Sequence, residues 1–143
     1  MATTGHVKWT GGLQDGSGSI DTGSGAVDGL TYSAASRFAD GDGTNPEELL
    51  GAAHASCFSM ALTLFLEQAG HKPEGVETTA TVTLKQETGA YTIHRIALET
   101  VGTVPDITEE QFQDAAEKAK EQCPVSKALA SVPTITLDAK LAS

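Results

Sequence analysis

The segment from residue 44 to 70, TNPEELLGAAHASCFSMALTLFLEQAG, constrains the fold more than any other part of the chain. Asn45 or Thr44 can cap a helix, Pro46 suits its first position, and Gly70 is a natural stop. These signals predict one continuous helix of about 24 residues, roughly 36 Å long.

The predicted helix is apolar around its whole circumference. Between Ala55 and Leu66, three small hydroxyl residues are the only polar side chains. Such a helix has to be enclosed on nearly every side. One small sheet and one amphipathic helix hardly cover that length, so we expect a second copy of the chain to cover it in an intertwined homodimer. A helix wrapped by its own sheet is the alternative.

The remaining elements indicate an α+β fold. Glycine-rich turns separate three expected strands, HVKWTGG, GSGSIDTGSG and LTYSAASRF, before the long helix. After it come a hairpin around the turn QETGA, a helix opened by Thr108 with Gln111 three residues on, a short helix beginning at Pro124, and a last strand, TITLDAKL. The predicted order is βββ-α-ββ-α-α-β with a long buried central helix, and we expect residues 1–143 to form a single domain.

Charge and segment composition exclude several kinds of partner. The net charge of -10 argues against binding to nucleic acid or to an anionic membrane, since both require clustered Lys and Arg. No basic stretch followed by an apolar one opens the chain, and the apolar run at 57–66 is interrupted and short for a bilayer. We therefore expect a cytoplasmic protein without a membrane partner, whose two cysteines are redox-active, metal-binding or inert rather than a static disulfide.

The two cysteines stand in different predicted environments. Cys123 falls at the expected N-cap of a short helix, where unpaired backbone N–H groups and the helix dipole favour a thiolate. Cys57 lies near the middle of the long helix, so its spacing alone fits a buried, inert cysteine. If Cys57 is a nucleophile, a cation from another element has to activate it. Arg37, at the end of the third expected strand, can turn inward, whereas Arg95 fits an exposed strand position.

Four segments together resemble the OsmC/Ohr family, most closely its osmotically inducible protein C branch. They are SRF (36–38), GTNPEELLGAAHASCFSMAL (43–62), KAKEQCPVSKAL (118–129) and ITLDAKL (135–141). The resemblance covers essentially the whole chain in the right order. It implies a thiol-dependent peroxidase that reduces organic hydroperoxides in stress defence, works as an obligate dimer with active sites at the subunit interface, and uses no cofactor.

The resemblance also implies a role for each of four residues. Cys57 matches the peroxidatic cysteine and Cys123 the resolving cysteine, which would form a redox-active disulfide with it. Arg37 matches the arginine that activates the thiolate, and Glu47 matches the carboxylate that holds this arginine. The reductant implied is a dithiol of the lipoyl type or a small thiol.

Helix geometry limits how these four residues can meet. Glu47 and Cys57 are separated by about 15 Å along a continuous helix. Either the helix breaks early, or Arg37 and Glu47 serve the Cys57 of a partner chain, which is the arrangement we expect. An apolar pocket beside Ala53, Phe58, Met60 and Ala61 would favour hydroperoxides with organic tails.

Two other functions compete with the peroxidase. His54 and Cys57 stand one helical turn apart, and Cys123 could join them as a third ligand of a zinc ion with an open position. A stress or binding protein with inert cysteines is the second alternative.

Overall fold

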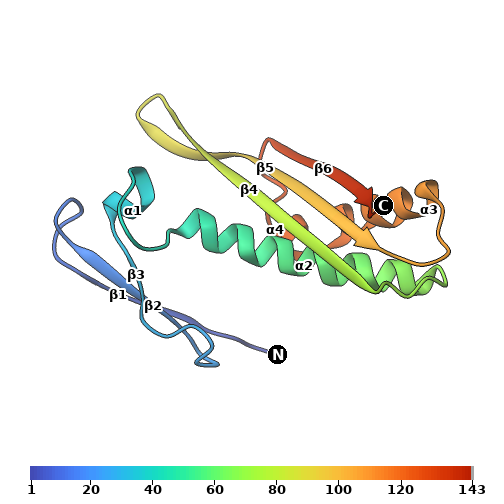
Figure 1. Cartoon of the computed structure of the whole chain (residues 1–143). Helices are drawn as coiled ribbons and strands as arrows, with labels where there is room; N and C mark the ends of the chain where they lie inside the picture. Colours follow the sequence, from blue (N-terminus) through green and yellow to red (C-terminus); the bar gives the residue numbers. More distant parts are fainter. Residues whose placement is uncertain (143) are drawn as a thin grey trace. The chain divides into compact units, whose positions relative to one another are not determined.

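A computed structural model describes residues 1–142, which fall into two compact units, Met1–Leu49 and the part from Leu50 onward. Each unit is described by itself. Figure 1 shows the elements in chain order, three strands and a short helix before the long helix, then a hairpin, two helices and a last strand. The α+β prediction is confirmed, with one additional helix.

The N-terminal unit contains a small antiparallel sheet in the order β1-β2-β3. Its strands are β1 (Gly5–Thr10), β2 (Ser17–Thr22) and β3 (Leu30–Tyr32). Every residue of β1 is exposed, and no apolar side chain of residues 1–49 is buried. This sheet therefore has no hydrophobic core of its own in the isolated chain.

The third strand is shorter than the sequence predicted, because a helix, α1 (Ala34–Phe38), begins directly after it. Ser33 caps α1: its hydroxyl accepts from the Ser36 N–H, and the Ser36 hydroxyl accepts from the Ser33 N–H. This capping box uses serine where glutamate or glutamine is usual. Arg37 consequently lies in the last turn of α1 and does not end a strand.

The long helix α2 (Pro46–Gln68) is unbroken over 23 residues. Asn45 caps it, because its side-chain oxygen accepts from the Glu48 N–H at 2.8 Å, and Gly70 stops it with a φ of +91°. The Glu48 carboxylate accepts from the Thr44 hydroxyl, so Asn45 and Glu48 form only half of a capping box. The helix boundaries agree with the prediction.

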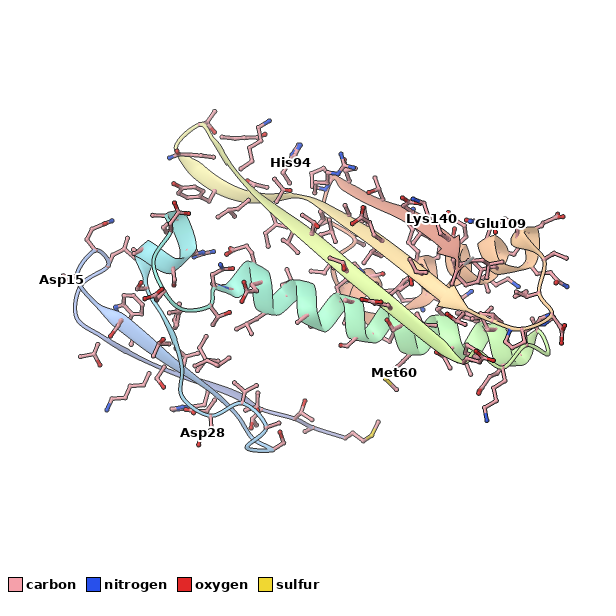
Figure 2. All side chains as sticks on the ribbon, in the orientation of Figure 1. Asp15, Asp28, Met60, His94, Glu109 and Lys140 are labelled. Carbon is pink, nitrogen blue, oxygen red and sulfur yellow. The ribbon has the colours of Figure 1, made fainter. Side chains whose placement is uncertain are left out.

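A single stripe of α2 is buried in the isolated chain. The buried positions recur every three or four residues: Gly51, His54, Phe58, Leu62 and Leu66. The opposite side carries Met60, which is 77% exposed and points away from the helix in Figure 2, and Leu64, which is 50% exposed. The chain's own sheet therefore covers less of this helix than the prediction of a buried central helix implies.

By length and composition alone, α2 would also suffice to cross a membrane, which corrects the expectation that no segment is long and apolar enough. The apolar run seen in the sequence, residues 57–66, begins after Ser56 and ends before Glu67, whereas the helix extends from Pro46 to Gln68. Core helices of soluble proteins satisfy the same criterion.

The second unit is built on a sheet in the order β4-β5-β6. Strands β4 (Gly75–Glu87) and β5 (Ala90–Thr103) form the predicted hairpin, whose two-residue turn places Thr88 and Gly89 at positive φ. Strand β6 (Thr134–Leu141) pairs in parallel with β5. A parallel pair needs a crossover connection, which two helices supply.

The two crossover helices are α3 (Glu109–Gln122) and α4 (Pro124–Ala128). The predicted capping box between Thr108 and Gln111 is present in full. The core joins residues of α2, β5, α3 and β6: Phe58, Leu62, Leu66, Ile96, Leu98, Phe112, Ala115, Ala116, Ala119 and Ala139. This core fixes α2, which carries Cys57, against α3, whose C-cap is Cys123.

Candidate active site

Cys57 lies near the middle of α2, and its side chain is half-buried. It is a free thiol that hydrogen-bonds to the sulfur of Cys123, and the backbone N–H of Val125 points to it as well. The structure thus brings the two cysteines into direct contact in the second unit. The spacing of the residues alone had left open whether they meet.

Cys123 occupies the predicted position at the N-terminus of α4, and its side chain is fully buried. Its sulfur accepts a hydrogen bond from the Ser126 N–H at 3.4 Å, as an N-cap side chain does. The Ser126 side chain and the Val125 backbone also donate to this sulfur. Cys123 therefore sits where several donors converge.

The two thiols differ in acidity because their donors differ. Burial raises the pKa of Cys57, and the hydrogen bond to Cys123 raises it further. Burial alone would raise the pKa of Cys123 too, but the hydrogen bonds from Cys57, Ser126 and Val125 outweigh it and lower this pKa. In the isolated chain the hydrogen bonds thus lower the pKa of Cys123, whereas burial and the contact with Cys123 raise the pKa of Cys57.

A second contact joins α2 to α4 one helical turn away from the cysteines. His54 is fully buried, and its Nε2 lies 2.8 Å from the Ser126 hydroxyl. Its other ring nitrogen, Nδ1, has no hydrogen-bond partner in the part of the chain that the structure describes. Burial lowers the pKa of His54. The sequence interpretation had not singled out Ser126, although His54 precedes Cys57 by the same three residues by which Ser126 follows Cys123.

The zinc alternative finds no support in this geometry. Nε2 of His54 is engaged with Ser126, and within residues 1–142 no group of three or more His, Cys, Asp or Glu side chains is placed to hold a metal ion.

An open apolar hollow of about 560 Å³ lies beside Cys57. It is lined by Cys57, Met60, Ala61, Leu64, Phe65, Gln122 and Pro124. Met60 and Ala61 were predicted to line a pocket here, whereas Phe58 is buried in the core and Ala53 does not line the hollow. The hollow gives molecules with apolar groups access to the sulfur of Cys57.

Arg37 and Glu47 form an ion pair within the N-terminal unit. Nη2 of Arg37 donates to Oε1 of Glu47 at 2.6 Å, and Nε donates to both carboxylate oxygens at 3.1 and 3.2 Å. The Glu47 side chain is only 10% exposed, and that of Arg37 is 36% exposed. The hydrogen bonds to Glu47 raise the pKa of Arg37, so the guanidinium stays charged.

Short polar contacts hold the two charged residues in register. The Ser36 hydroxyl donates to the Thr44 carbonyl at 2.7 Å, and the Asn45 side chain donates to the Ser36 carbonyl at 3.2 Å. Both contacts tie α1, which carries Arg37, to the segment that opens α2. Of the four predicted site residues, Arg37 and Glu47 thus form one pair and Cys57 and Cys123 another, each within its own unit.

A pair of free, hydrogen-bonded cysteines beside an apolar hollow defines a two-cysteine thiol protein, and comparison with known proteins gives the family. The family described as OsmC-like protein matches residues 39–138. Peroxiredoxin OsmC of Escherichia coli K12 is 44% identical over 139 residues, which cover 97% of this chain and 96% of that protein. The chain belongs to the OsmC family.

More distant relatives share the fold. An organic hydroperoxide resistance protein-like protein of Staphylococcus aureus USA300 is 35% identical over 91 residues, which cover 63% of this chain and 64% of that one. The crystal structure of the organic hydroperoxide resistance protein OhrB of Bacillus subtilis matches with a TM-score of 0.69 at 27% identity, covering 97% of this chain and 98% of that one. An organic hydroperoxide resistance protein from Elizabethkingia anophelis matches with a TM-score of 0.72 at 28% identity, covering 100% of this chain and 98% of that one.

Proposed function

We propose that this protein reduces organic hydroperoxides to alcohols through the thiolate of Cys57 and a disulfide between Cys57 and Cys123. As a member of the OsmC family with relatives named peroxiredoxin and organic hydroperoxide resistance protein, the chain is a thiol-dependent peroxidase of stress defence. The observation that carries the proposed mechanism is the direct contact of the two free cysteines beside an open apolar hollow.

The first step of the proposed cycle oxidises Cys57. Its thiolate attacks the distal oxygen of the hydroperoxide, so that an S–O bond forms and the O–O bond breaks. The alkoxide leaves with the electron pair of the O–O bond and takes up a proton to become the alcohol. Cys57 is left as a sulfenic acid.

The second step forms the disulfide and releases water. The thiolate of Cys123 attacks the sulfur of the Cys57 sulfenic acid, an S–S bond forms, and the S–O electron pair leaves with hydroxide, which becomes water on protonation. An external dithiol, of the lipoyl type or a small thiol, then reduces the disulfide by thiol–disulfide exchange and is itself oxidised. A reducing compartment such as the cytoplasm would supply it.

The apolar hollow supports the choice of substrate. Its lining of Met60, Ala61, Leu64 and Phe65 offers an organic tail a surface away from water, which hydrogen peroxide cannot use. Organic hydroperoxides should therefore react faster than hydrogen peroxide.

Cys57 needs an activating cation, because its pKa is raised in the isolated chain by burial and by the bond to Cys123. Arg37 is the candidate, since Glu47 holds two of its nitrogens and fixes its guanidinium plane. Helix α2 has no early break, and Glu47 and Cys57 lie about 15 Å apart along it. We therefore assign Arg37 and Glu47 to the Cys57 of a partner subunit.

Exposed apolar side chains support the homodimer that this assignment requires. Met60 and Leu64 are exposed on α2, and Val7, Leu13 and Phe38 are exposed in the N-terminal unit. A second copy of the chain that covers these residues would bury the remaining sides of α2, which is apolar around its whole circumference.

Two cysteine variants test the chemistry. Cys57→Ser should abolish the consumption of cumene hydroperoxide with dithiothreitol, and Cys123→Ser should retain a first turnover but accumulate oxidised Cys57, detected by mass spectrometry. If Cys57→Ser consumes the hydroperoxide at the parent rate, the cysteines are inert and the binding-protein alternative gains support.

Mixed dimers test which subunit supplies Arg37. In the proposed arrangement, homodimers of Cys57→Ser are inactive and homodimers of Arg37→Met keep about a hundredth of the parent activity at pH 7. After they are unfolded together and refolded, a mixed dimer contains one site with Cys57 from one chain and Arg37 from the other. Random mixing should restore about a quarter of the parent activity. No recovery, with mixed dimers verified by mass, would mean that Arg37 acts on its own chain.

A further inference from the structure

The proposed mechanism leaves one buried ionisable group without a task, the imidazole of His54. It is fully buried on α2, one turn before Cys57, and its Nε2 contacts the Ser126 hydroxyl at 2.8 Å. The backbone N–H of Ser126 in turn donates to the sulfur of Cys123 at 3.4 Å, and the Ser126 side chain is among the hydrogen-bonding groups that lower the pKa of Cys123. A chain of buried hydrogen bonds thus runs from His54 through Ser126 to Cys123.

The unpaired ring nitrogen Nδ1 of His54 determines which atom donates in the hydrogen bond between His54 and Ser126. If Nδ1 carried the proton, a buried N–H would have no acceptor, since Nδ1 has no partner among residues 1–142. Orphaned buried N–H groups are rare, and a lone pair without a donor is the milder defect. The proton therefore resides on Nε2, which donates to the Ser126 oxygen. The Ser126 hydroxyl proton is then free to point at the sulfur of Cys123.

We infer that Ser126 donates its hydroxyl hydrogen bond to the thiolate of the resolving Cys123, and that His54 is the positioning residue that fixes this hydroxyl. This inference rests on the proposed function, because it concerns the second step of the cycle. There the charge on Cys123 has to be maintained until its sulfur bonds to that of Cys57. The same donor stabilises Cys123 as the leaving thiolate when an external dithiol attacks the sulfur of Cys57 in the disulfide.

The surroundings of His54 favour an uncharged imidazole that positions the Ser126 hydroxyl. Burial lowers the pKa of His54, which keeps the ring uncharged near neutral pH. The titratable groups that face Cys123 are Cys57 and, behind Ser126, His54, both from α2. Lys127 of α4 is exposed, and α3 and β5 contribute apolar side chains to the core: Phe112, Ala115, Ala116, Ala119, Ile96 and Leu98. In so apolar a setting, a single hydrogen bond to a charged sulfur has a large effect.

Single-turnover kinetics of Ser126→Ala test the inference. The reduced protein is mixed with one equivalent of cumene hydroperoxide, and consumption of the hydroperoxide and formation of the disulfide are followed separately by acid quench and mass spectrometry. Disulfide formation at pH 7 should be about tenfold slower than in the parent protein. Hydroperoxide consumption should not fall, because a less acidic Cys123 competes less with Cys57 for the negative charge.

The pH profile separates this role from simple packing. In Ser126→Ala the backbone donors remain, so the deficit should shrink as rising pH ionises Cys123 without help. A deficit of equal size at pH 7 and pH 9.5, or disulfide formation at the parent rate at pH 7, would overturn the inference.

Variants of His54 complete the design. His54→Gln retains an N–H near the position of Nε2, and Ser126→Thr retains the hydroxyl, so both should keep most of the parent rate of disulfide formation. His54→Leu fills a similar volume without a donor and should be slowed about threefold to tenfold. Equal rates in His54→Leu and His54→Gln would exclude His54 from the relay. If the parent protein itself consumes no hydroperoxide, the proposed function fails. If the parent protein is active and the variants form the disulfide at the parent rate, only the role of Ser126 and His54 fails.

Discussion

The two compact units hold their functional pairs by different physical means. In the second unit, Cys57 and Cys123 are brought together by a hydrophobic core that joins α2 and α3 to β5 and β6. In the N-terminal unit no apolar side chain is buried, and Arg37 and Glu47 are positioned by ionic and polar hydrogen bonds. The sulfur pair is therefore formed within one chain, whereas the cation pair acts, in the proposed dimer, on the Cys57 of the partner subunit.

The largest difference between the units should be seen in unfolding. Phe112 is fully buried, and its ring lies against Gly102, where no Cβ would fit. Phe112→Ala should lower the free energy of unfolding by about 3–5 kcal/mol, because it removes apolar contacts and leaves a cavity. Val7→Ala, at an exposed position of β1, should cost less than about 1 kcal/mol. Chemical denaturation measures both, and similar losses would show that the N-terminal unit has its own tightly packed interior.

Arg37→Met should have the next largest effect, on catalysis. Without the guanidinium, the pKa of Cys57 remains raised by burial and by its bond to Cys123, so the thiolate fraction falls at neutral pH. Hydroperoxide consumption at pH 7 should drop about 100-fold and recover as the pH rises toward the raised pKa. Arg95→Met is the matched control, since Arg95 is exposed and donates to the Thr136 hydroxyl at a long distance of 3.4 Å. An unchanged pH profile in Arg37→Met would show that Arg37 does not influence the ionisation of Cys57.

Glu47→Gln should be milder, because Arg37 keeps its charge and loses only the carboxylate that orients it. We expect hydroperoxide consumption to fall about tenfold, with little change in global stability. The neighbouring Glu48→Gln provides the control, since the Glu48 side chain accepts from the Thr44 hydroxyl and does not contact Arg37. Equal activity of the two variants would show that the ion pair has no functional role.

The buried His54 of the second unit should make stability depend on pH. Because burial lowers the pKa of His54 in the folded state, the unfolded chain binds the proton more readily. The free energy of unfolding should therefore decrease as the pH falls below about 6.5, by at most about 1.4 kcal/mol per pH unit. His54→Gln should lose this component, and replacement of the exposed His6 by Gln should keep it. Denaturation at pH 7.5 and 5.5 checks the sign.

The sequence predicted those parts of the fold that local signals determine. The caps of α2 and α3, the hairpin turn, the short helix at Pro124 and the last strand lie where the residues placed them. Helix α1 was missed, because Ser33 and Ser36 cap it with side chains that are equally common in turns and its five residues show no periodicity. The contact of Ser126 with His54 was missed for another reason, since it joins residues far apart in the sequence whose meeting depends on the packing of α2 against α4.

The capping boxes of α1 and α3 allow the smallest expected effects in the two units to be compared. Thr108→Ala removes a cap from α3, whose buried residues belong to the core, and should lower the free energy of unfolding by about 1 kcal/mol. Ser33→Ala removes the cap of α1, a five-residue helix outside any hydrophobic core, so global unfolding should change by less than about 0.5 kcal/mol. Yet α1 carries Arg37, and Ser36 joins it to Thr44. Ser33→Ala should thus reduce hydroperoxide consumption about threefold without a change in stability. Thr108→Ala should lower stability without a change in hydroperoxide consumption. Chemical denaturation and single-turnover rates on the same samples measure both effects. A parallel loss of stability and activity in both variants would contradict the prediction. It would show that the pair of Arg37 and Glu47 depends on the same core as the cysteines.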